Sequence, residues 1–170
     1  PLILPMLRSL SELAVQTRHH KDRFVSLGTD ASKVHVTGSI KFDAVMAQGY
    51  VDRLDRSRRL IAGRTVLLGA STHKGEEAAL VSLLPALQKQ IPGFLLVLAP
   101  RHTHRCDQLR RAFESSGQSV VSFSDGRAVA LDDEVFMVDV MGELDALFEL
   151  ASVAFVGGSL VPIGGHNMLE

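Results

Sequence analysis

The segment FLLVLA at residues 94–99 is apolar at every position, and it constrains the fold more than any other feature. A strand with one face in solvent alternates apolar and polar residues, whereas a parallel strand covered on both faces is apolar throughout. Further strand-like segments alternate with helix-like segments. The strands are expected at 65–68, 119–123, 135–138 and 152–156, and the helices at 75–90, 104–116 and 142–150. The strand at 152–156 is apolar and is also expected to be buried. This alternation predicts an α/β protein with a Rossmann-like, doubly wound parallel sheet.

The composition excludes several classes of protein. A hydrophobic fraction of 46% with 22% charged residues is typical of globular proteins and excludes a disordered chain. The net charge of −1 provides no surplus of cations for phosphate backbones, so no nucleic-acid partner is expected. No apolar run approaches the roughly 18 residues that span a bilayer. The single cysteine, Cys106, cannot form an internal disulfide, and we interpret it as a small half-buried side chain rather than a nucleophile.

The chain is expected to contain parts of two domains. Its 170 residues suffice for one ordinary domain with a piece of a neighbour, and its ends at Pro1 and Glu170 are interpreted as cuts in a longer protein. Residues 1–42 contain a helix pattern closed by Gly28 and a short strand pattern, too little to bury a core alone. We therefore predict that residues 1–42 end a preceding domain and that residues 43–170 form a second one. The arginine-rich start of the second, residues 43–64, predicts a helix with a solvated basic face.

Three predicted strands end in unusual polar residues, and ligands of such sheets bind where the strands end. The first of these turns is GASTHKGEE, residues 69–77. Ser71 or Thr72 could cap the following helix, whose free N–H groups favour an anionic oxygen, and His73 adds a donor. The alternative is an ordinary helix start, in which the two glutamates only complement the helix dipole.

The second turn is APRHTHRCD, residues 99–107. Arg101 and His102 follow the buried strand, and a guanidinium at this place can bind a phosphate or carboxylate through two hydrogen bonds. The spacing of His102, His104 and Cys106 suggests zinc, but no second ligand pair with metal spacing exists in the sequence. We therefore predict no metal site and a solvent-facing His104.

The third turn, FVGGSLVPIGGHNMLE at residues 155–170, carries the strongest signal. Gly157 and Gly158 directly follow a strand, and two more glycines come soon after, which favours a backbone that approaches a ligand closely. Asn167 can cap a new helix, with Glu170 in capping-box register and within reach of ribose hydroxyls. The alternative is a flexible loop with a capping box. The segment is neither a Walker loop nor a GxGxxG placed after a first strand, which disfavours a nicotinamide oxidoreductase.

A fourth and weaker turn is DVMGEL, residues 139–144. Met141 and Gly142 could offer backbone groups and an apolar cover to a nucleobase. The same residues also suit an ordinary helix start, so this turn alone decides little.

Taken in order, TGSIKFD at residues 37–43, GASTHKGEE, APRH at residues 99–102, DVMGEL and FVGGSLVPIGGHNMLE resemble the Kdo transferases, the 3-deoxy-D-manno-octulosonic acid transferases of lipopolysaccharide biosynthesis. The resemblance extends from about residue 13 onward. The last motif is highly specific and the others are individually modest. The sequence departs from the family at Lys74, often a glutamate, at His104, usually acidic, and at Val140, usually threonine, which affects fine donor contacts only.

The resemblance implies a GT-B glycosyltransferase, with residues 1–42 from the acceptor-side domain and linker and residues 43–170 from an incomplete C-terminal, donor-binding domain. Such an enzyme inverts configuration as it transfers Kdo from CMP-Kdo to a lipid A precursor, and it needs no cofactor or metal. On matching positions, the donor-binding residues would be Ser71, Thr72, His73, Arg101, His102, Met141, Gly142, Gly157, Gly158, Ser159, Asn167 and Glu170.

The resemblance also implies which functional parts lie outside this sequence. The family's general base is a glutamate near the start of the acceptor-side domain, and the membrane contact is an N-terminal anchor; neither is present here. The fragment is therefore expected to be soluble and inactive, while the full-length protein is expected at the cytoplasmic face of the bacterial inner membrane.

Two other functions fit the same residues. One is another GT-B sugar-nucleotide enzyme, such as a UDP-sugar transferase or an epimerase, which would share the glycine-rich turn and the terminal glutamate. The other is a noncatalytic nucleotide-binding module. A preference for UDP over CMP would favour the first, and the lack of a glutamate base in the upstream sequence would favour the second.

Overall fold

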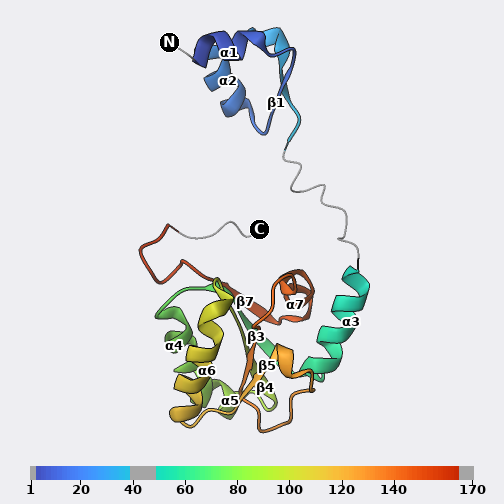
Figure 1. Cartoon of the computed structure of the whole chain (residues 1–170), viewed down its shortest axis with the longest axis vertical. Helices are drawn as coiled ribbons and strands as arrows, with labels where there is room; N and C mark the ends of the chain where they lie inside the picture. Colours follow the sequence, from blue (N-terminus) through green and yellow to red (C-terminus); the bar gives the residue numbers. More distant parts are fainter. Residues whose placement is uncertain (1–2, 39–48, 165–170) are drawn as a thin grey trace. The chain divides into compact units, whose positions relative to one another are not determined.

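The computed structural model describes residues 3–38 and 49–164, which belong to two compact units, Pro1–Ala47 and Gln48–Met168 (Figure 1). The boundary predicted between residues 42 and 43 falls outside the described residues. Within the described residues, no helix has both the length and the apolar character that crossing a bilayer requires.

The smaller unit contains a two-stranded parallel sheet. Its elements, in chain order, are α1 (Ile3–Ser9), β1 (Leu13–Val15), α2 (Arg18–Ser26), the 3-10 turn η1 (Ala31–Lys33) and β2 (Val34–Val36). The predicted helix and strand are α2 and β2, and Gly28, at φ +95°, follows the helix as expected. The sequence did not indicate α1 or β1. Together these elements bury the apolar side chains of Leu7, Val15 and Val34.

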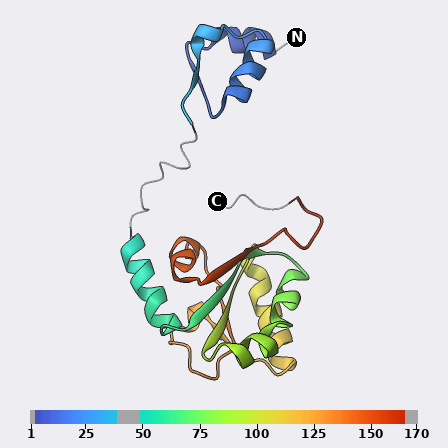
Figure 2. The same cartoon turned by 180° about the vertical axis from the view of Figure 1, so that it is seen from behind.

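The larger unit contains a five-stranded parallel sheet in the order β5-β6-β4-β3-β7. The strands are β3 (Thr65–Thr72), β4 (Phe94–Pro100), β5 (Val120–Ser122), β6 (Val135–Met137) and β7 (Val153–Val156). The helices are α3 (Tyr50–Ile61), α4 (Glu76–Val81), α5 (Leu84–Gln90), α6 (Cys106–Ser115) and α7 (Leu144–Leu150), with 3-10 turns η3 (Thr103–Arg105) and η4 (Phe123–Asp125). Helices cover both faces of the sheet, as Figure 2 shows from behind. The predicted Rossmann-like arrangement is therefore confirmed.

The core consists of two apolar layers, one on each face of the sheet, and β4 contributes to both. Leu95 and Val97 pack with residues of α3 and α7, whereas Leu96 and Leu98 pack with residues of α4, α5 and α6. All four of these side chains are completely buried. Because successive side chains of a strand point to opposite faces, a strand between two helical layers must be apolar throughout.

Three predicted elements differ from the structure. The single helix expected at residues 75–90 is two helices, α4 and α5, because Pro85 has no N–H to continue the first helix and its ring would clash with the preceding turn. Strand β3 continues to Thr72, four residues beyond its predicted end. Strand β7 is not buried: Val153 is 63% exposed, since β7 lies at the edge of the described sheet and pairs only with β3.

The prediction of a solvated basic face is wrong for several arginines of residues 43–64. Arg53 donates to Asp145 at 2.5 Å, while Arg56 pairs with Glu143 and lies over the ring of Phe123. Since both carboxylates belong to the turn before α7 or to α7 itself, these arginines hold α3 against that helix. Arg64 donates to four backbone carbonyls, those of Gly93, Phe94, Ala130 and Asp133. Arg58 and Arg59 are exposed as predicted.

Candidate functional site

All five strands of the larger unit are parallel, so their carboxyl ends lie along one edge of the sheet, here called the carboxyl edge. The turns after β3 and β4 are joined there by a hydrogen bond from the N–H of Arg101 to the carbonyl of Thr72, at 2.9 Å. The turns after β3 and β7 are joined by a hydrogen bond from the N–H of Gly157 to the carbonyl of Ala70, at 2.8 Å. The three turns with the strongest sequence signals are therefore adjacent, as the sequence predicts.

Strand β3 ends in an unusual conformation at Ser71. This residue has φ +51°, in the left-handed region that residues other than glycine rarely adopt. The register against β4 shifts at the same place, between Ala70 and Thr72. The Ser71 side chain is half-buried, while Thr72 is fully buried. The irregular end of β3 thus leaves Ser71 the more accessible of the two predicted contacts.

The structure explains why glycine occupies positions after β7, for reasons that the sequence did not reveal. A Cβ on Gly157 would lie 2.1 Å from the carbonyl oxygen of Ser71, so only glycine fits against that backbone. Gly158 and Gly164 adopt φ of +78° and +90°, which favour glycine in any case. Close approach to a ligand is therefore not needed to explain Gly157, and its contact with a donor stays a prediction. Gly165 lies outside the described residues.

Glu76 joins the turns after β3 and β7, and sequence reasoning missed this role. Its completely buried carboxylate accepts four backbone hydrogen bonds, from the N–H groups of His73, Gly158, Ser159 and Leu160, at 2.8 to 3.0 Å. Although burial alone would raise the pKa of this carboxyl group, the four N–H donors hold the pKa below its usual value. The one signal in the sequence was a glutamate directly after a turn that also carries a histidine and a glycine.

The expected capping of α4 by Ser71 or Thr72 is wrong. The N-cap is Gly75, at φ +103°, and no side chain caps the helix there. Thr72 Oγ1 instead donates to Oε1 of Glu77, at 3.2 Å, because β3 carries Thr72 into the interior before the helix begins. The side chain of Thr72 is thus engaged inside the protein, and its predicted donor contact stays a prediction.

Glu77 forms a second buried carboxylate contact below the carboxyl edge. Arg105 binds it with both terminal nitrogens, at 2.8 Å and 3.3 Å, and the Glu77 side chain is only 1% exposed. A buried carboxylate needs such a partner, because an uncompensated charge in the interior is very costly. The two glutamates therefore do far more than complement the dipole of α4: they connect β3, β7 and the turn after β4.

Three histidines form a row at the ends of β3 and β4, here called the histidine row: His73, His102 and His104. The His73 and His102 ring centroids are 6.3 Å apart in an edge-to-face arrangement, and the His102 and His104 rings are stacked at 5.5 Å. Arg101, immediately before His102, is exposed. His104 is exposed as predicted, but it is packed against another ring rather than isolated.

The turn after β6 places Met141 and Gly142 in solvent. Met141 is 76% exposed, and Gly142 adopts φ +87°. The next residue, Glu143, is buried and pairs with Arg56 through Oε1, while its Oε2 has no hydrogen-bond partner among the described residues. Because β6 neighbours β4 in the sheet, this turn belongs to the same carboxyl edge as Arg101 and His102.

Cys106 lies at the start of α6, in an environment that disfavours reaction of its thiol. It is buried, and its Sγ is 3.7 Å from the carbonyl oxygen of Val138. Burial, together with nearby Asp139 and Asp107, raises the pKa of the thiol to about 11. The prediction that Cys106 is a packing residue and not a nucleophile agrees with this environment. Among the described residues, no three His, Cys, Asp or Glu side chains are grouped so as to hold a metal ion.

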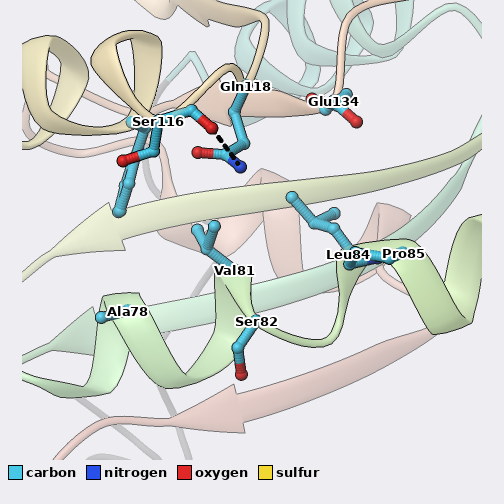
Figure 3. A pocket seen from close by; sticks show the side chains of 9 residues that line it. Ala78, Val81, Ser82, Leu84, Pro85, Ser116, Gln118 and Glu134 are labelled. Carbon is cyan, nitrogen blue, oxygen red and sulfur yellow. Dashed lines mark hydrogen bonds between the residues drawn. The ribbon is translucent and has the colours of Figure 1, made fainter.

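A surface pocket lies away from the predicted site residues (Figure 3). It is formed around the break between α4 and α5 and the end of α6, and Val81, Leu84, Phe113 and Gln118 are among its lining residues. None of the predicted donor-binding residues lines it. Of those residues, Asn167 and Glu170 lie outside the described part of the chain. The carboxyl edge therefore remains the candidate site.

Comparisons with known proteins point to one family. Residues 1–44 match the family model described as 3-Deoxy-D-manno-octulosonic-acid transferase (kdotransferase). The 3-deoxy-D-manno-octulosonic acid transferases of Haemophilus influenzae and Bordetella pertussis are each 32% identical to this chain, over 97% and 96% of it and 39% of their own lengths. A bifunctional glycosyltransferase/methyltransferase of Fusobacterium nucleatum is 31% identical over 99% of the chain and 26% of its own length. The chain thus spans about two fifths or less of these relatives.

A solved structure shows the same similarity at the level of the fold. The C-terminal CMP-Kdo binding domain of WaaA from Acinetobacter baumannii matches with a TM-score of 0.62 and 31% identity, over 71% of this chain and 64% of that one. This match confirms the predicted fold, a Rossmann-like domain of a GT-B glycosyltransferase. Over most of its length, the chain is thus similar to the 3-deoxy-D-manno-octulosonic acid transferases.

Proposed function

We propose that this chain is the donor-binding part of an inverting glycosyltransferase that transfers Kdo from CMP-Kdo to a lipid A precursor in lipopolysaccharide biosynthesis. The observation that carries the proposal is the similarity of 71% of this chain to a domain described as CMP-Kdo binding. The carboxyl edge supports it, because exposed Arg101, the histidine row and Ser71 are gathered there beside the turn that Glu76 holds.

In the proposed reaction, the bond between Kdo and the phosphate of CMP breaks and negative charge develops on the departing phosphate. Donors that are already in place stabilise such charge without having to reorganise, and this is usually the largest catalytic contribution. Arg101, His73 and His102 are the cationic and hydrogen-bonding side chains that we assign to this task. Met141 and Gly142 would cover the cytosine, while Gly157, Gly158 and Ser159 would line the phosphate side and Asn167 and Glu170 would reach the phosphate and ribose.

The structure bears on how the glycine turn would contact the donor. The N–H groups of Gly158 and Ser159 donate to Glu76, and Ser159 Oγ donates to the carbonyl of Val156 at 2.7 Å. A CMP-Kdo molecule at this turn would therefore contact the surface of the turn rather than free backbone amide groups. Glu76 serves the proposed site by keeping the turn in place.

We assign no residue of this chain as the general base that removes the proton of the acceptor hydroxyl. The buried carboxylates near the carboxyl edge have partners inside the protein: Glu76 the backbone N–H groups, Glu77 Arg105, and Glu143 Arg56 through Oε1. A base must reach the acceptor's proton, which these groups do not. We propose that the base, and a contact with the cytoplasmic face of the inner membrane where the lipid acceptor resides, come from other parts of the protein. The chain alone would then be inactive.

Titration with CMP, UMP and UDP, followed by isothermal calorimetry, tests the proposal. Binding of CMP that is at least about tenfold tighter than binding of UMP is expected, because the site would be shaped for cytosine. A clear preference for UDP would replace the proposal with a UDP-sugar enzyme. Since fixed side chains and not a metal would stabilise the phosphate, the same titration in EDTA is expected to give an unchanged affinity for CMP.

A further inference from the structure

His104 belongs to a row of three rings that crosses the carboxyl edge, although its residue type and exposure alone suggest an ordinary surface histidine. His73 follows β3 and His102 follows β4, and their rings meet edge to face. His104 adds a third ring, stacked on His102 with an angle of 25° between the ring planes. The row therefore extends from the turn after β3 along the turn after β4.

His102 and His104 are joined by the single 3-10 turn that follows β4. The N–H of Arg105 donates to the carbonyl of His102 at 3.1 Å, which closes the 3-10 turn η3. Arg105 itself turns inward to Glu77, so the turn separates a partly buried, paired guanidinium from two exposed imidazoles. His104 thus stays at the surface beside His102.

Two exposed cations are direct sequence neighbours of the histidine row. Exposed Lys74 follows His73 and exposed Arg101 precedes His102, while the charge of Arg105 is balanced by Glu77. Asp107, exposed in the first turn of α6, is the acidic residue nearest in sequence to His104. An anion that approaches this end of the carboxyl edge would meet two full positive charges and three imidazoles.

Backbone N–H groups, the other usual donors to an anion, are taken at the neighbouring turn. Glu76 accepts from His73, Gly158, Ser159 and Leu160, so these four groups already have an anionic partner. An incoming phosphate would have to replace a buried carboxylate in order to use them. The side chains of His102, His104 and Arg101 are exposed donors at this end of the edge.

We propose that His104 is a further donor-binding residue, which acts with His102 to bind the phosphate of the nucleoside monophosphate part of the donor. The proposal rests on the proposed function and adds a residue whose ring was predicted only to face solvent. In it, His102 is oriented between His73 and His104, and His104 contributes an N–H to a phosphate oxygen. The nucleoside part of the donor lies beyond its reach.

Titrations of the protein with CMP and with cytidine, each followed by NMR, test this role, because cytidine lacks the phosphate. His104→Ala and His104→Phe are compared with the wild type; neither has a side-chain N–H, and the phenylalanine keeps a stacking ring. His19→Ala is the matched control, since His19 is also exposed and lies beside a second ring, that of His20, in the smaller unit. Circular dichroism verifies that each variant is folded.

We expect both His104 variants to bind CMP about fivefold more weakly, as loss of one exposed hydrogen bond to a charged group implies, with unchanged affinity for cytidine. The control should bind both ligands as the wild type does. Unchanged CMP affinity in either His104 variant, or an equal loss of affinity for cytidine, would overturn the inference and leave the proposed function standing. A wild-type protein that binds neither ligand would instead overturn the proposed function, and this inference with it.

Discussion

Gly157 packs directly against the backbone of Ser71, so closely that a Cβ on Gly157 would lie 2.1 Å from the Ser71 carbonyl oxygen. Ser71 is itself held at φ +51°, and Glu76 joins the same two turns through its carboxylate. The ends of β3 and β7 are therefore interlocked through their backbones. A site built on these two ends is held rigidly before any ligand arrives.

Gly157→Ala is expected to destabilise the protein by about 2–3 kcal/mol, because the new methyl group overlaps backbone that cannot move aside as a side chain would. The free energy of unfolding in urea measures this. Gly164→Ala is the control: unlike Gly157, Gly164 has a positive φ, of +90°, but an added Cβ there meets no atom within 4 Å. A Gly157→Ala variant no less stable than the control would show that the two turns are not packed as described.

Glu76→Gln is expected to release the turn after β7. An uncharged amide would turn N–H groups toward the four backbone N–H donors, and we expect a loss of about 2–4 kcal/mol. The pKa of Glu76 lies below its usual value in the folded state, so its stabilising effect is present at neutral pH and is lost as the pH falls through that pKa.

Hydrogen exchange gives the sharpest measurement for Glu76. The amides of residues 158–160 should exchange at least about tenfold faster in Glu76→Gln than in the wild type, through local opening. Glu114→Gln, which changes an exposed glutamate of α6, should leave them unchanged. Equal protection in both variants would argue against the four hydrogen bonds to Glu76.

The sheet could be predicted because its determinants are local. The side chains of residues 95–98 lie alternately on the two faces of β4, both of which are covered by helices, so all four must be apolar. The helices between the strands show helical periodicity of their own. Pro85 indicates the break between α4 and α5, but the apolar pattern continues across it, and the sequence therefore predicted a single helix. The exposure of β7 depends on the order of the strands in the sheet, and this order cannot be deduced from any single segment of the sequence.

The site could be predicted only as far as the turns, because the contacts that hold it are between residues far apart in the sequence. Glu76 meets Gly158, 82 positions away, and Arg56 meets Glu143, 87 positions away. Apart from the histidine and the glycine in the turn before Glu76, nothing next to Glu76 or Arg56 in the sequence distinguishes them from ordinary helix residues. Arginines that look solvated and glutamates that look like helix-dipole partners acquire their roles only when the sheet brings strands together.

Arg101 and Arg105 should behave in opposite ways when each is changed to alanine. Arg101 is exposed, so its loss is expected to leave thermal unfolding nearly unchanged; under the proposed function it should lower Kdo transfer by the full-length protein about 100-fold, as removal of one charge-stabilising donor does. Arg105→Ala leaves Glu77 buried without its guanidinium, and we expect a loss of stability of about 3–5 kcal/mol. An unaltered rate in Arg101→Ala would remove Arg101 from the site.

Cys106 is expected to resist thiol reagents in the folded protein. With its pKa raised to about 11, mainly by burial, only about 0.1% of the thiol is ionised at pH 8, and access is blocked as well. Reaction with Ellman's reagent should therefore be at least about a hundredfold slower than in the urea-unfolded chain. Equal rates in the two states would show that the start of α6 opens readily.

Asp133 should make the stability of the larger unit depend on pH in acid. Its buried carboxylate accepts from Arg127 at 2.7 Å and 3.1 Å, from the N–H of Ala130 at 2.6 Å and from Ser119 Oγ at 2.9 Å. These donors, above all Arg127, lower the pKa of Asp133 from 3.8 to about 2 in spite of burial. A lowered folded-state pKa means that the stabilisation is present above the unfolded value of 3.8 and is lost as the pH falls toward 2.

The shift in the pKa of Asp133 corresponds to about 2 kcal/mol, which the pH dependence of Asp133→Asn should display. Urea unfolding of the wild type and of this variant should differ by about that amount at pH 6, and the difference should shrink between pH 4 and pH 2, as the wild-type carboxylate is protonated. Asp132→Asn, at the exposed neighbouring position, should follow the wild type throughout. A difference that stays constant down to pH 2 would mean that the Asp133→Asn substitution removes packing rather than a charge held by Arg127.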